Sequence, residues 1–383
     1  MAAQHSQGRF PHNEIISLLD VNRRFNLAES TAQDLTLGEL LDLAGETSIR
    51  NLRLGYATSA GDPTLRAAIA GANGVHQDDV ITTQGTALGL FLLALELCRP
   101  GDEAVLVTPC FPPSRDALIG IGASVTDVPL DFDNGFRLDI ARIEPALSSR
   151  TRLVSLASPQ NPSGITTPLS AIRQLLELMA RKAPDAFLFV DETYREAVYG
   201  DNEPTPSAGS IDRRVITGSS ISKALGAPGL RTGWLTVRDP DLCTRVVTAK
   251  LNTVISGSVL DEALAAVLLH NRQRVLAPRR VLMSTALQLL DAWCAAEADH
   301  IEWVRPDAGA LCCMRLRSDA FSESAVDRFW TSLPDHDLQL AEGDWFTTSR
   351  RTFRLGFGYL PTELLPSALV ALSHVLETTR DTR

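Results

Sequence analysis

Short apolar runs alternate with stretches of helical periodicity over the first two thirds of the chain, and this alternation limits the possible folds more than any other feature. Strand-like runs are expected at 80–83, 104–108, 153–156, 187–190 and 215–217. Helical patterns separate most of them, for example 86–98 and 169–181, and Asp62 with Pro63 supplies an N-cap and a first helical position. Because the strand-like runs are apolar throughout, we expect a largely parallel sheet that is covered on both faces.

The last third of the chain has a different pattern. A long helical stretch at 276–294 is followed by strand-like runs at 301–304, 311–316 and 353–356 and by an amphipathic helix over 362–380. We therefore expect an α/β chain with two domains, which suits a length of 383 residues. The large domain covers 36–275, and a smaller α+β domain combines 276–383 with residues 1–35, of which 1–13 form a mobile arm.

Composition excludes several classes of function. The formal net charge is −10 and no basic stripe is present, so neither a nucleic-acid partner nor an anionic membrane surface is expected. No apolar stretch is long enough to span a membrane and the N-terminus has no apolar leader, so the expected location is the cytoplasm. The six cysteines form no CxxC pair and the seven histidines lack zinc-ligand spacing. We expect buried thiols and no metal site.

One lysine lies in an unusual setting. The stretch 220–234 reads SISKALGAPGLRTGW, so that Lys223 follows a strand and Arg231 lies eight residues further on. A lone lysine is normally a solvated surface charge, but small and apolar neighbours of this kind cannot form a solvated helix face. A lysine held in such a place can act as an amine nucleophile.

This stretch resembles the cofactor-lysine segment of fold-type I pyridoxal-phosphate (PLP) enzymes, specifically the class I/II aminotransferase family. Further segments follow in the order found in that family: GYATSAGDPTLR at 55–66, QGTA at 84–87, TPCF at 108–111, SPQNPSG at 158–164, DETY at 191–194 and TFRLG at 352–356. The resemblance covers roughly residues 27 to 380 and implies the fold-type I architecture, a PLP cofactor and a homodimer.

The resemblance implies a catalytic set of three residues. Lys223 holds PLP as an internal aldimine and later removes the proton from the substrate Cα, while Asp191 keeps the pyridine nitrogen protonated. Asn161 and Tyr194 bind the phenolic oxygen of the cofactor. Taken alone, Asp191 would also fit a helix N-cap, and Asn161 would fit a plain turn residue before Pro162.

A second set of residues is implied to hold the rest of the cofactor. The phosphate meets backbone N–H groups at a helix N-terminus, a hydroxyl and a guanidinium, and a tyrosine reaches it from the partner subunit. Phe111 stacks on the pyridine face, although a core phenylalanine is its alternative reading. The residues of the phosphate site are Gly85, Thr86, Ala87, Ser220, Arg231 and the partner-reaching Tyr56.

The substrate is expected to be bound by an arginine on a strand. Arg354 lies between Phe353 and Leu355 and suits the planar α-carboxylate, and Asn161 is placed beside it, whereas the neighbouring 350–351 pair is read as solvated. Ala28 and Glu29 stand where many relatives have a glycine-containing turn beside the substrate. A carboxylate there suits a cationic side chain such as a guanidinium, but Glu29 could equally point to solvent or cap the following helix.

The sequence therefore predicts a PLP-dependent aminotransferase of an L-amino acid, with a keto acid as the second substrate. An alternative keeps the cofactor and the first deprotonation but changes the outcome to cyclisation, elimination or oxidation, as in the capreomycidine-synthase-like members of the family. A third reading, a PLP-binding regulator, would need an appended DNA-binding domain, and the leading residues are too few and not basic.

Overall fold

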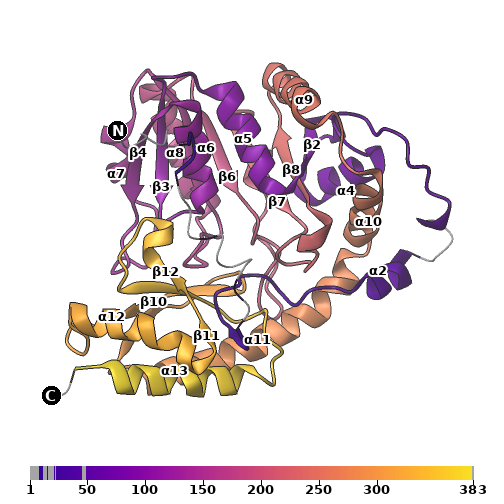
Figure 1. Ribbon diagram of the computed structural model, residues 1–383. Coiled ribbons are helices and arrows are strands. Elements are labelled where there is room, and N and C mark those ends of the chain that lie inside the picture. The colour runs from indigo at the N-terminus through magenta and orange to yellow at the C-terminus, as the bar shows by residue number, and fades with distance from the viewer. Residues whose placement is uncertain (1–7, 12–14, 16–20, 22, 45–48, 382–383) are drawn as a thin grey trace, which may run out of the picture.

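The computed structural model describes residues 8–11, 15, 21, 23–44 and 49–381. Most of the expected mobile arm over 1–13 therefore lies outside the described residues. The described chain forms a large sheet covered by helices and a smaller sheet beneath it, with one long helix connecting the two (Figure 1).

The large sheet has seven strands in the order β2-β8-β7-β6-β5-β3-β4. All neighbours pair in parallel except β8, which is antiparallel to both β2 and β7. The strands are β2 (Val80–Gln84), β3 (Glu103–Thr108), β4 (Ser124–Pro129), β5 (Thr151–Ala157), β6 (Phe187–Asp191), β7 (Val215–Ser220) and β8 (Thr232–Val237). The prediction of a largely parallel α/β sheet is confirmed; β4 and β8 are strands that the sequence analysis did not include.

Helices cover both faces of this sheet. Alternate strand residues belong to two separate hydrophobic cores: Leu153 packs under α5, α6 and α9, whereas Val154 packs under α8. The predicted cap is confirmed, since the Asp62 carboxylate accepts a hydrogen bond from the backbone N–H of Leu65 (2.9 Å) at the start of α4. The helices are α4 (Pro63–Asn73), α5 (Gly85–Leu97), α6 (Pro112–Ile121), α7 (Ile140–Ile143), α8 (Leu169–Lys182), α9 (Pro240–Val254) and α10 (Val259–His270).

The C-terminal unit is an antiparallel sheet packed on helices, as the α+β pattern predicted. Its strand order is β12-β13-β10-β9, and its core lies between the sheet and three helices. The elements are α11 (Arg272–Ala296), β9 (Ile301–Val304), β10 (Leu311–Leu316), α12 (Glu323–Ser332), β12 (Ala341–Glu342), β13 (Thr352–Gly356) and α13 (Leu365–Thr379).

The segment before residue 36 packs on the C-terminal unit. Strand β1 (Phe25–Asn26) pairs in parallel with β11 (Leu338–Gln339), and Phe25 and Leu27 join the core of that unit. The chain then crosses to the large sheet, where α2 (Leu37–Ala44) packs near α10. These contacts support the proposed division into 36–275 and 1–35 with 276–383, with the boundary at 275 in the first turn of α11.

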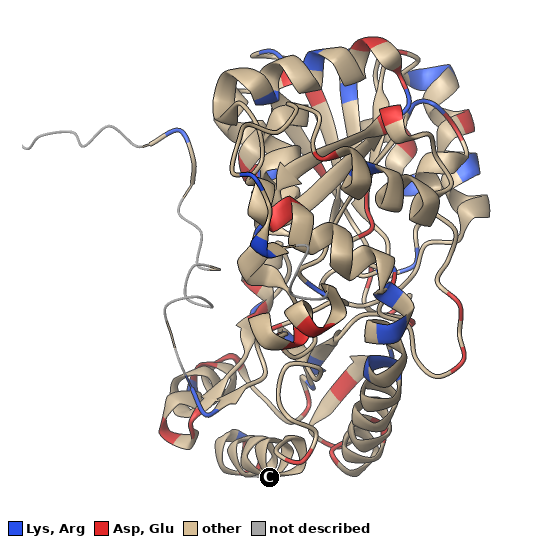
Figure 2. Ribbon diagram, turned by 90° about the vertical axis from the view of Figure 1, so that its right-hand side faces the viewer, with Lys and Arg blue, Asp and Glu red and all other residues tan. Residues whose placement is uncertain are grey.

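Two further features concern the surface and the thiols. Within the described residues, no helix combines the length and the apolar character needed to cross a membrane. Basic and acidic residues are interspersed along the ribbon in the view of Figure 2. The six cysteines are free; five are buried as predicted, and Cys243 is half-buried. The cytoplasmic location stays a prediction.

Candidate active site

A cavity of about 700 Å³ opens where the carboxyl ends of β5, β6 and β7 meet the start of α5 and the segment that follows β1. Parallel sheets commonly bind ligands at this edge. Most of the predicted site residues line the cavity: Glu29, Gly85, Thr86, Ala87, Phe111, Asn161, Asp191, Tyr194, Ser220, Lys223, Arg231 and Arg354. Ala28 takes part only through its carbonyl oxygen, and Tyr56 lies outside, with 88% of its surface exposed.

Lys223 reaches the cavity from the turn that follows β7. Its Nζ donates hydrogen bonds to Glu29 Oε1 (3.2 Å) and to Ser30 Oγ (3.2 Å). The backbone carbonyl of Lys223 accepts a hydrogen bond from the N–H of Ala32 (3.1 Å). This bond joins the turn that contains Lys223 to the segment that follows β1. The side chain keeps 24% exposure, which leaves the amine accessible from the cavity.

The start of α5 forms a cradle that suits an anion. Gly85 has φ +71°, and a Cβ on it would lie 2.5 Å from Arg231 Nη2, so only glycine allows the guanidinium to approach the helix N-terminus this closely. A Cβ on Gly233 of β8 would likewise collide with the Gly85 backbone at 2.6 Å. Among the described residues, none forms a hydrogen bond with the buried Thr86 Oγ1. Backbone N–H groups, a hydroxyl and a positive charge thus converge on one spot.

Asp191 is the last residue of β6 and begins a turn, so its alternative reading as a helix N-cap is wrong. Its Oδ1 accepts hydrogen bonds from the Thr193 N–H (3.0 Å) and from Thr193 Oγ1 (2.5 Å). Burial raises the pKa of this carboxyl, while the bonds from Thr193 and the charge of Lys223 act in the opposite direction. A positive partner in the cavity would favour the ionised form.

Arg354 extends from β13 into the cavity and is 2% exposed. Its Nη1 donates to Asn161 Oδ1 (3.1 Å) and its Nη2 to the Ala28 carbonyl (2.6 Å), while the guanidinium lies 4.9 Å from the centre of the Phe346 ring. Its Nε has no hydrogen-bond partner in the part of the chain that the structure describes. Burial lowers the Arg354 pKa, against the opposing effects of Tyr194 and Glu29. This buried cation, with an unused donor, is suited to a planar carboxylate.

The two neighbouring arginines lie outside the cavity, but only Arg350 is solvated as predicted; the Arg351 side chain is 15% exposed and donates to the Phe321 carbonyl. Arg350 forms surface ion pairs with Asp327 (2.7 Å) and Glu342 (2.9 Å), and Arg351 pairs with the exposed Glu323. Neither lines the 700 Å³ cavity.

Glu29 forms the acidic side of the cavity. Asn26 Oδ1 accepts from the N–H groups of Ala28 and Glu29 (3.1 Å each), which folds this segment into a tight turn and aims Glu29 inward. Burial alone would raise the Glu29 pKa, but Lys223, Arg354 and the Ser30 N–H outweigh it, so the pKa is lowered and the side chain is held as a carboxylate. The alternatives of a solvent-facing or helix-capping Glu29 are therefore wrong.

Several lining residues were missing from the sequence prediction. Ser30 lies between Lys223 and Tyr194. Asp34 and Tyr359 lie on the same side of the cavity as Glu29. Burial raises the pKa of both groups, and the nearby charge of Glu29 raises it further. Phe346 does not line the cavity but packs against the Arg354 guanidinium. No spacing rule points to these residues: the contacts of Ser30 join segments 164 and 193 positions apart, and Asp34 and Phe346 belong to no recognised motif although they lie near Glu29 and Arg354 in the sequence.

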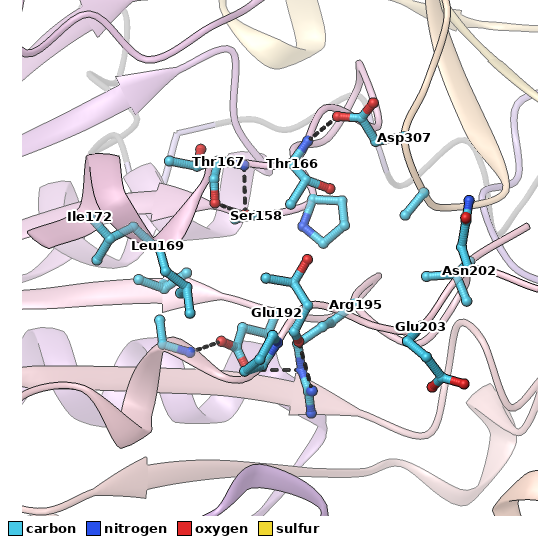
Figure 3. Close-up of a pocket in the computed structure, with 17 residues that line it drawn as sticks. Ser158, Thr166, Thr167, Leu169, Ile172, Glu192, Arg195, Asn202, Glu203 and Asp307 are labelled. Carbon is cyan, nitrogen blue, oxygen red and sulfur yellow. Dashed lines mark hydrogen bonds and ion pairs between the residues drawn. The ribbon is translucent and has the colours of Figure 1, made fainter.

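A second cavity of about 270 Å³ lies beside the turn after β6 (Figure 3). None of the predicted site residues lines it. Its arginine, Arg195, is already paired with Glu192 (Nε to Oε2, 3.2 Å) and donates to the Asn73 side chain (2.9 Å). This cavity offers no reactive amine, so the candidate site is the larger one.

The chain belongs to the family of class I and II aminotransferases, whose model matches residues 24–372. Capreomycidine synthase of Streptomyces vinaceus is 31% identical over 358 residues, which cover 92% of this chain and 90% of that protein. Arginine–pyruvate transaminase of Pseudomonas aeruginosa is 27% identical over 303 residues, covering 77% and 75%. Family members are PLP-dependent aminotransferases or related PLP enzymes, and PLP is the cofactor of this protein as well.

Solved structures show the same fold. A PLP-dependent aminotransferase from Streptococcus suis superimposes with a TM-score of 0.88 at 23% identity, covering 98% of this chain and all of that chain. The PLP-dependent cyclase OrfR superimposes with a TM-score of 0.83 at 24% identity, covering 92% and 93%. The fold is therefore the fold-type I architecture, as the resemblance implied.

The residues present fit PLP. The cradle with its unpartnered Thr86 hydroxyl and the Arg231 guanidinium suits a phosphate. The carboxyl of Asp191, whose pKa burial raises, suits a protonated ring nitrogen, and Lys223 supplies an accessible amine on the same cavity. A cavity of 700 Å³ is within the range of ligand pockets, roughly 300–1,000 Å³.

Proposed function

We propose that the protein is an aminotransferase of an L-amino acid with a cationic side chain, and that Lys223 is the amine that binds the aldehyde of PLP. One observation carries this proposal: the Lys223 amine, the Arg354 guanidinium and the Glu29 carboxylate face a single cavity. The cavity thus offers a nucleophile, a carboxylate receptor and an acceptor for a second cation.

PLP, when bound, takes into its ring the electron pair left when a bond at the substrate Cα breaks. Asp191 is the residue that would keep the ring nitrogen protonated, and that pairing would offset the burial that raises the pKa of its carboxyl. Lys223 holds the aldehyde carbon until the substrate amine replaces it. The released Nζ then removes the Cα proton as a general base.

The remaining residues orient the two molecules. Asn161 and Tyr194 face the side of the cavity where the phenolic oxygen would lie, and Phe111 would pack on the ring. Arg354 binds the α-carboxylate through Nε, its donor without a protein partner. The phosphate is held by the cradle at 85–87 with Ser220 and Arg231.

The cationic substrate follows from the fate of the Lys223–Glu29 ion pair. Once Lys223 is bonded to the cofactor, its amine is no longer a free ammonium, and Glu29 keeps only the Ser30 N–H bond and the charge of Arg354. A partly buried carboxylate that has lost its ion-pair partner is unfavourable, so a substrate ammonium or guanidinium would take that place. Asp34 and Tyr359 extend this side of the cavity. The name of one relative, arginine–pyruvate transaminase, agrees with a substrate related to arginine.

Cyclisation or elimination is the second candidate function. The identity of 31% to capreomycidine synthase over most of both chains favours it specifically. Both candidates begin with removal of the Cα proton and use the same residues up to that point. They differ in whether the proton taken from Cα would be delivered to the cofactor carbon or a group would leave from Cβ.

A homodimer remains part of the proposal. Tyr56 is exposed and lies outside the cavity of its own chain, which supports a role at the phosphate of a partner subunit.

The test is a half-reaction with the loaded enzyme, without keto acid. Arginine and ornithine are expected to convert the bound cofactor to pyridoxamine phosphate and release a keto acid, and leucine and glutamate to react far more slowly. Glu29→Gln should lower the preference for arginine over leucine by at least about tenfold, because the substrate cation loses its carboxylate. If leucine and glutamate react best, the cationic substrate is wrong. If none of the four yields pyridoxamine phosphate, transamination is wrong, and β-hydroxyarginine then tests the cyclase candidate.

A further inference from the structure

Ser30 occupies the junction between the two groups that would handle protons in this site. Its Oγ lies 3.2 Å from Lys223 Nζ and 2.9 Å from the Tyr194 hydroxyl, and the residue is 1% exposed. A buried serine that bridges the amine and the phenol is not explained by packing alone.

The number of available hydrogens fixes one direction in this chain of bonds. A lysine ammonium has three donors and no acceptor, so Lys223 donates to Ser30 Oγ. Between Ser30 and Tyr194 either hydroxyl can donate, because the serine oxygen has two lone pairs and can accept from both neighbours. In either arrangement Ser30 Oγ is hydrogen-bonded to the amine and to the phenol at once.

The backbone around Ser30 holds the hydroxyl in place. Its N–H donates to Glu29 Oε1 (2.8 Å), and the residues on either side are tied to different parts of the molecule. The Leu27 carbonyl accepts from Gly356 of β13 (2.7 Å), and the Ala32 N–H donates to the Lys223 carbonyl (3.1 Å). The Oγ is therefore a fixed point between two units rather than a freely rotating surface group.

We propose that Ser30 is a positioning residue for the reaction: its hydroxyl holds the released Lys223 amine within reach of the substrate Cα and orients the Tyr194 hydroxyl toward the cavity. This inference rests on the proposed role of Lys223. It adds a residue that neither the sequence pattern nor the proposed function requires. Ser30 touches the amine and the phenol, and it acts through them.

The test compares Ser30→Ala with wild type in two measurements. In the first, cofactor-free protein is mixed with PLP at a series of pH values, and the absorbance gives the rate at which Lys223 reacts. Only a neutral amine attacks an aldehyde, and the Ser30 hydroxyl stabilises the charged form. Its loss should move the midpoint of the rate profile to lower pH by about one unit.

The second measurement is steady-state kinetics of the loaded enzyme. Ser30→Ala should lower kcat by about ten- to hundredfold, the usual effect of losing a hydrogen bond to a charged group, and leave KM for the amino acid within about twofold. Ser30→Thr keeps the hydroxyl and should restore the pH profile. If the added methyl prevents folding, the alanine variant alone decides.

Ser207→Ala is the matched control, because Ser207 is also buried and hydrogen-bonded but lies outside the cavity. It should leave both the pH profile and kcat unchanged. If Ser30→Ala matches wild type in midpoint and kcat, the proposal is overturned, while Lys223→Ala still reports separately on the role of the lysine. If Ser30→Ala changes only thermal stability, as Ser207→Ala does, the role of Ser30 is structural and the proposal is also wrong.

Discussion

Lys223 and Lys250 are two lysines withdrawn from bulk solvent that share the same kinds of neighbour. Lys223 donates to Ser30 and Glu29 at the cavity, and Lys250 donates to Thr82 Oγ1 (3.1 Å), which in turn donates to Glu262 (2.6 Å). The difference is access. Lys223 keeps 24% exposure and faces a 700 Å³ cavity, whereas Lys250 is fully buried in α9 and does not line that cavity.

For these two lysines, a lowered pKa and access to the cavity point to different residues. Burial lowers the pKa of Lys250 to about 8, although Glu262 acts against the shift. A search for a depressed lysine pKa alone would therefore select Lys250 as a nucleophile. A nucleophile must also reach its substrate, and geometry comes before pKa in assigning a role. The cavity selects Lys223.

The largest expected effect is the loss of activity when Lys223, rather than Lys250, is replaced. The chain has three lysines, Lys182, Lys223 and Lys250, so each can be replaced in turn. Lys223→Ala should lower the amino-transfer rate by about a thousandfold or more, because both the covalent attachment and the general base are lost. Borohydride reduction of the loaded protein followed by peptide mapping should place the label on Lys223 alone.

Lys182→Ala is the control for that experiment, since Lys182 only forms an exposed ion pair with Glu144. It should retain wild-type activity. A label on Lys250, or full activity in Lys223→Ala, would reverse the assignment of the two lysines.

A smaller effect is the pH dependence that Lys250 gives to the free energy of unfolding. The folded-state pKa of Lys250 is about 8 and its ordinary value is 10.5, so between these values the unfolded chain binds a proton that the native chain does not. Stability from this group therefore rises with pH across that window. From pH 8 to pH 10 the free energy of unfolding of wild type should rise by about 2 kcal/mol relative to Lys250→Met. Urea unfolding of both proteins at the two pH values measures it, and parallel curves would contradict the buried, depressed lysine.

The smallest effect compares the two bridging hydroxyls. Thr82→Val removes the hydroxyl between Lys250 and Glu262 without changing the side-chain shape. It should lower the free energy of unfolding by about 1–2 kcal/mol while the activity of the loaded enzyme stays within about twofold of wild type. Ser30→Ala should show the opposite pattern, with a loss of rate and little loss of stability. Equal effects of the two substitutions on kcat would remove the functional distinction between the lysines.

The fold was predictable where a helix or strand can be recognised from its own residues alone. The runs at 301–304 and 311–316 match β9 and β10 at both ends, and the Asp62–Pro63 start of α4 is correct to the residue. Strand β8 was missed because Thr232–Val237 follows directly on the lysine segment and pairs antiparallel with β2 and β7, which nothing in its own residues indicates. Strand β4 has mostly exposed side chains and lacks the apolar run of a central strand.

The site was predictable to the extent that its residues belong to contiguous motifs. Most motif residues stand just after a strand or at the start of a helix, and the topology of the large sheet brings those ends together; Arg354 lies inside β13, and Tyr56 lies in a loop outside the cavity. Ser30 and Phe346 belong to no motif, and their contacts with Lys223 and Arg354 arise only after the N-terminal segment and the loop before β13 have packed. The inward direction of Glu29 depends in the same way on the turn that Asn26 builds.

Segment 26–34 crosses β13 at Gly356, where a Cβ would lie only 1.8 Å from the Glu29 carbonyl oxygen. The acidic wall of the cavity is thus carried by residues 26–34, and the cofactor cradle by residues 85–87, 220 and 231. In the proposed enzyme, substitutions in segment 26–34 can change the substrate preference without changing the residues that bind the cofactor, as long as position 356 stays glycine.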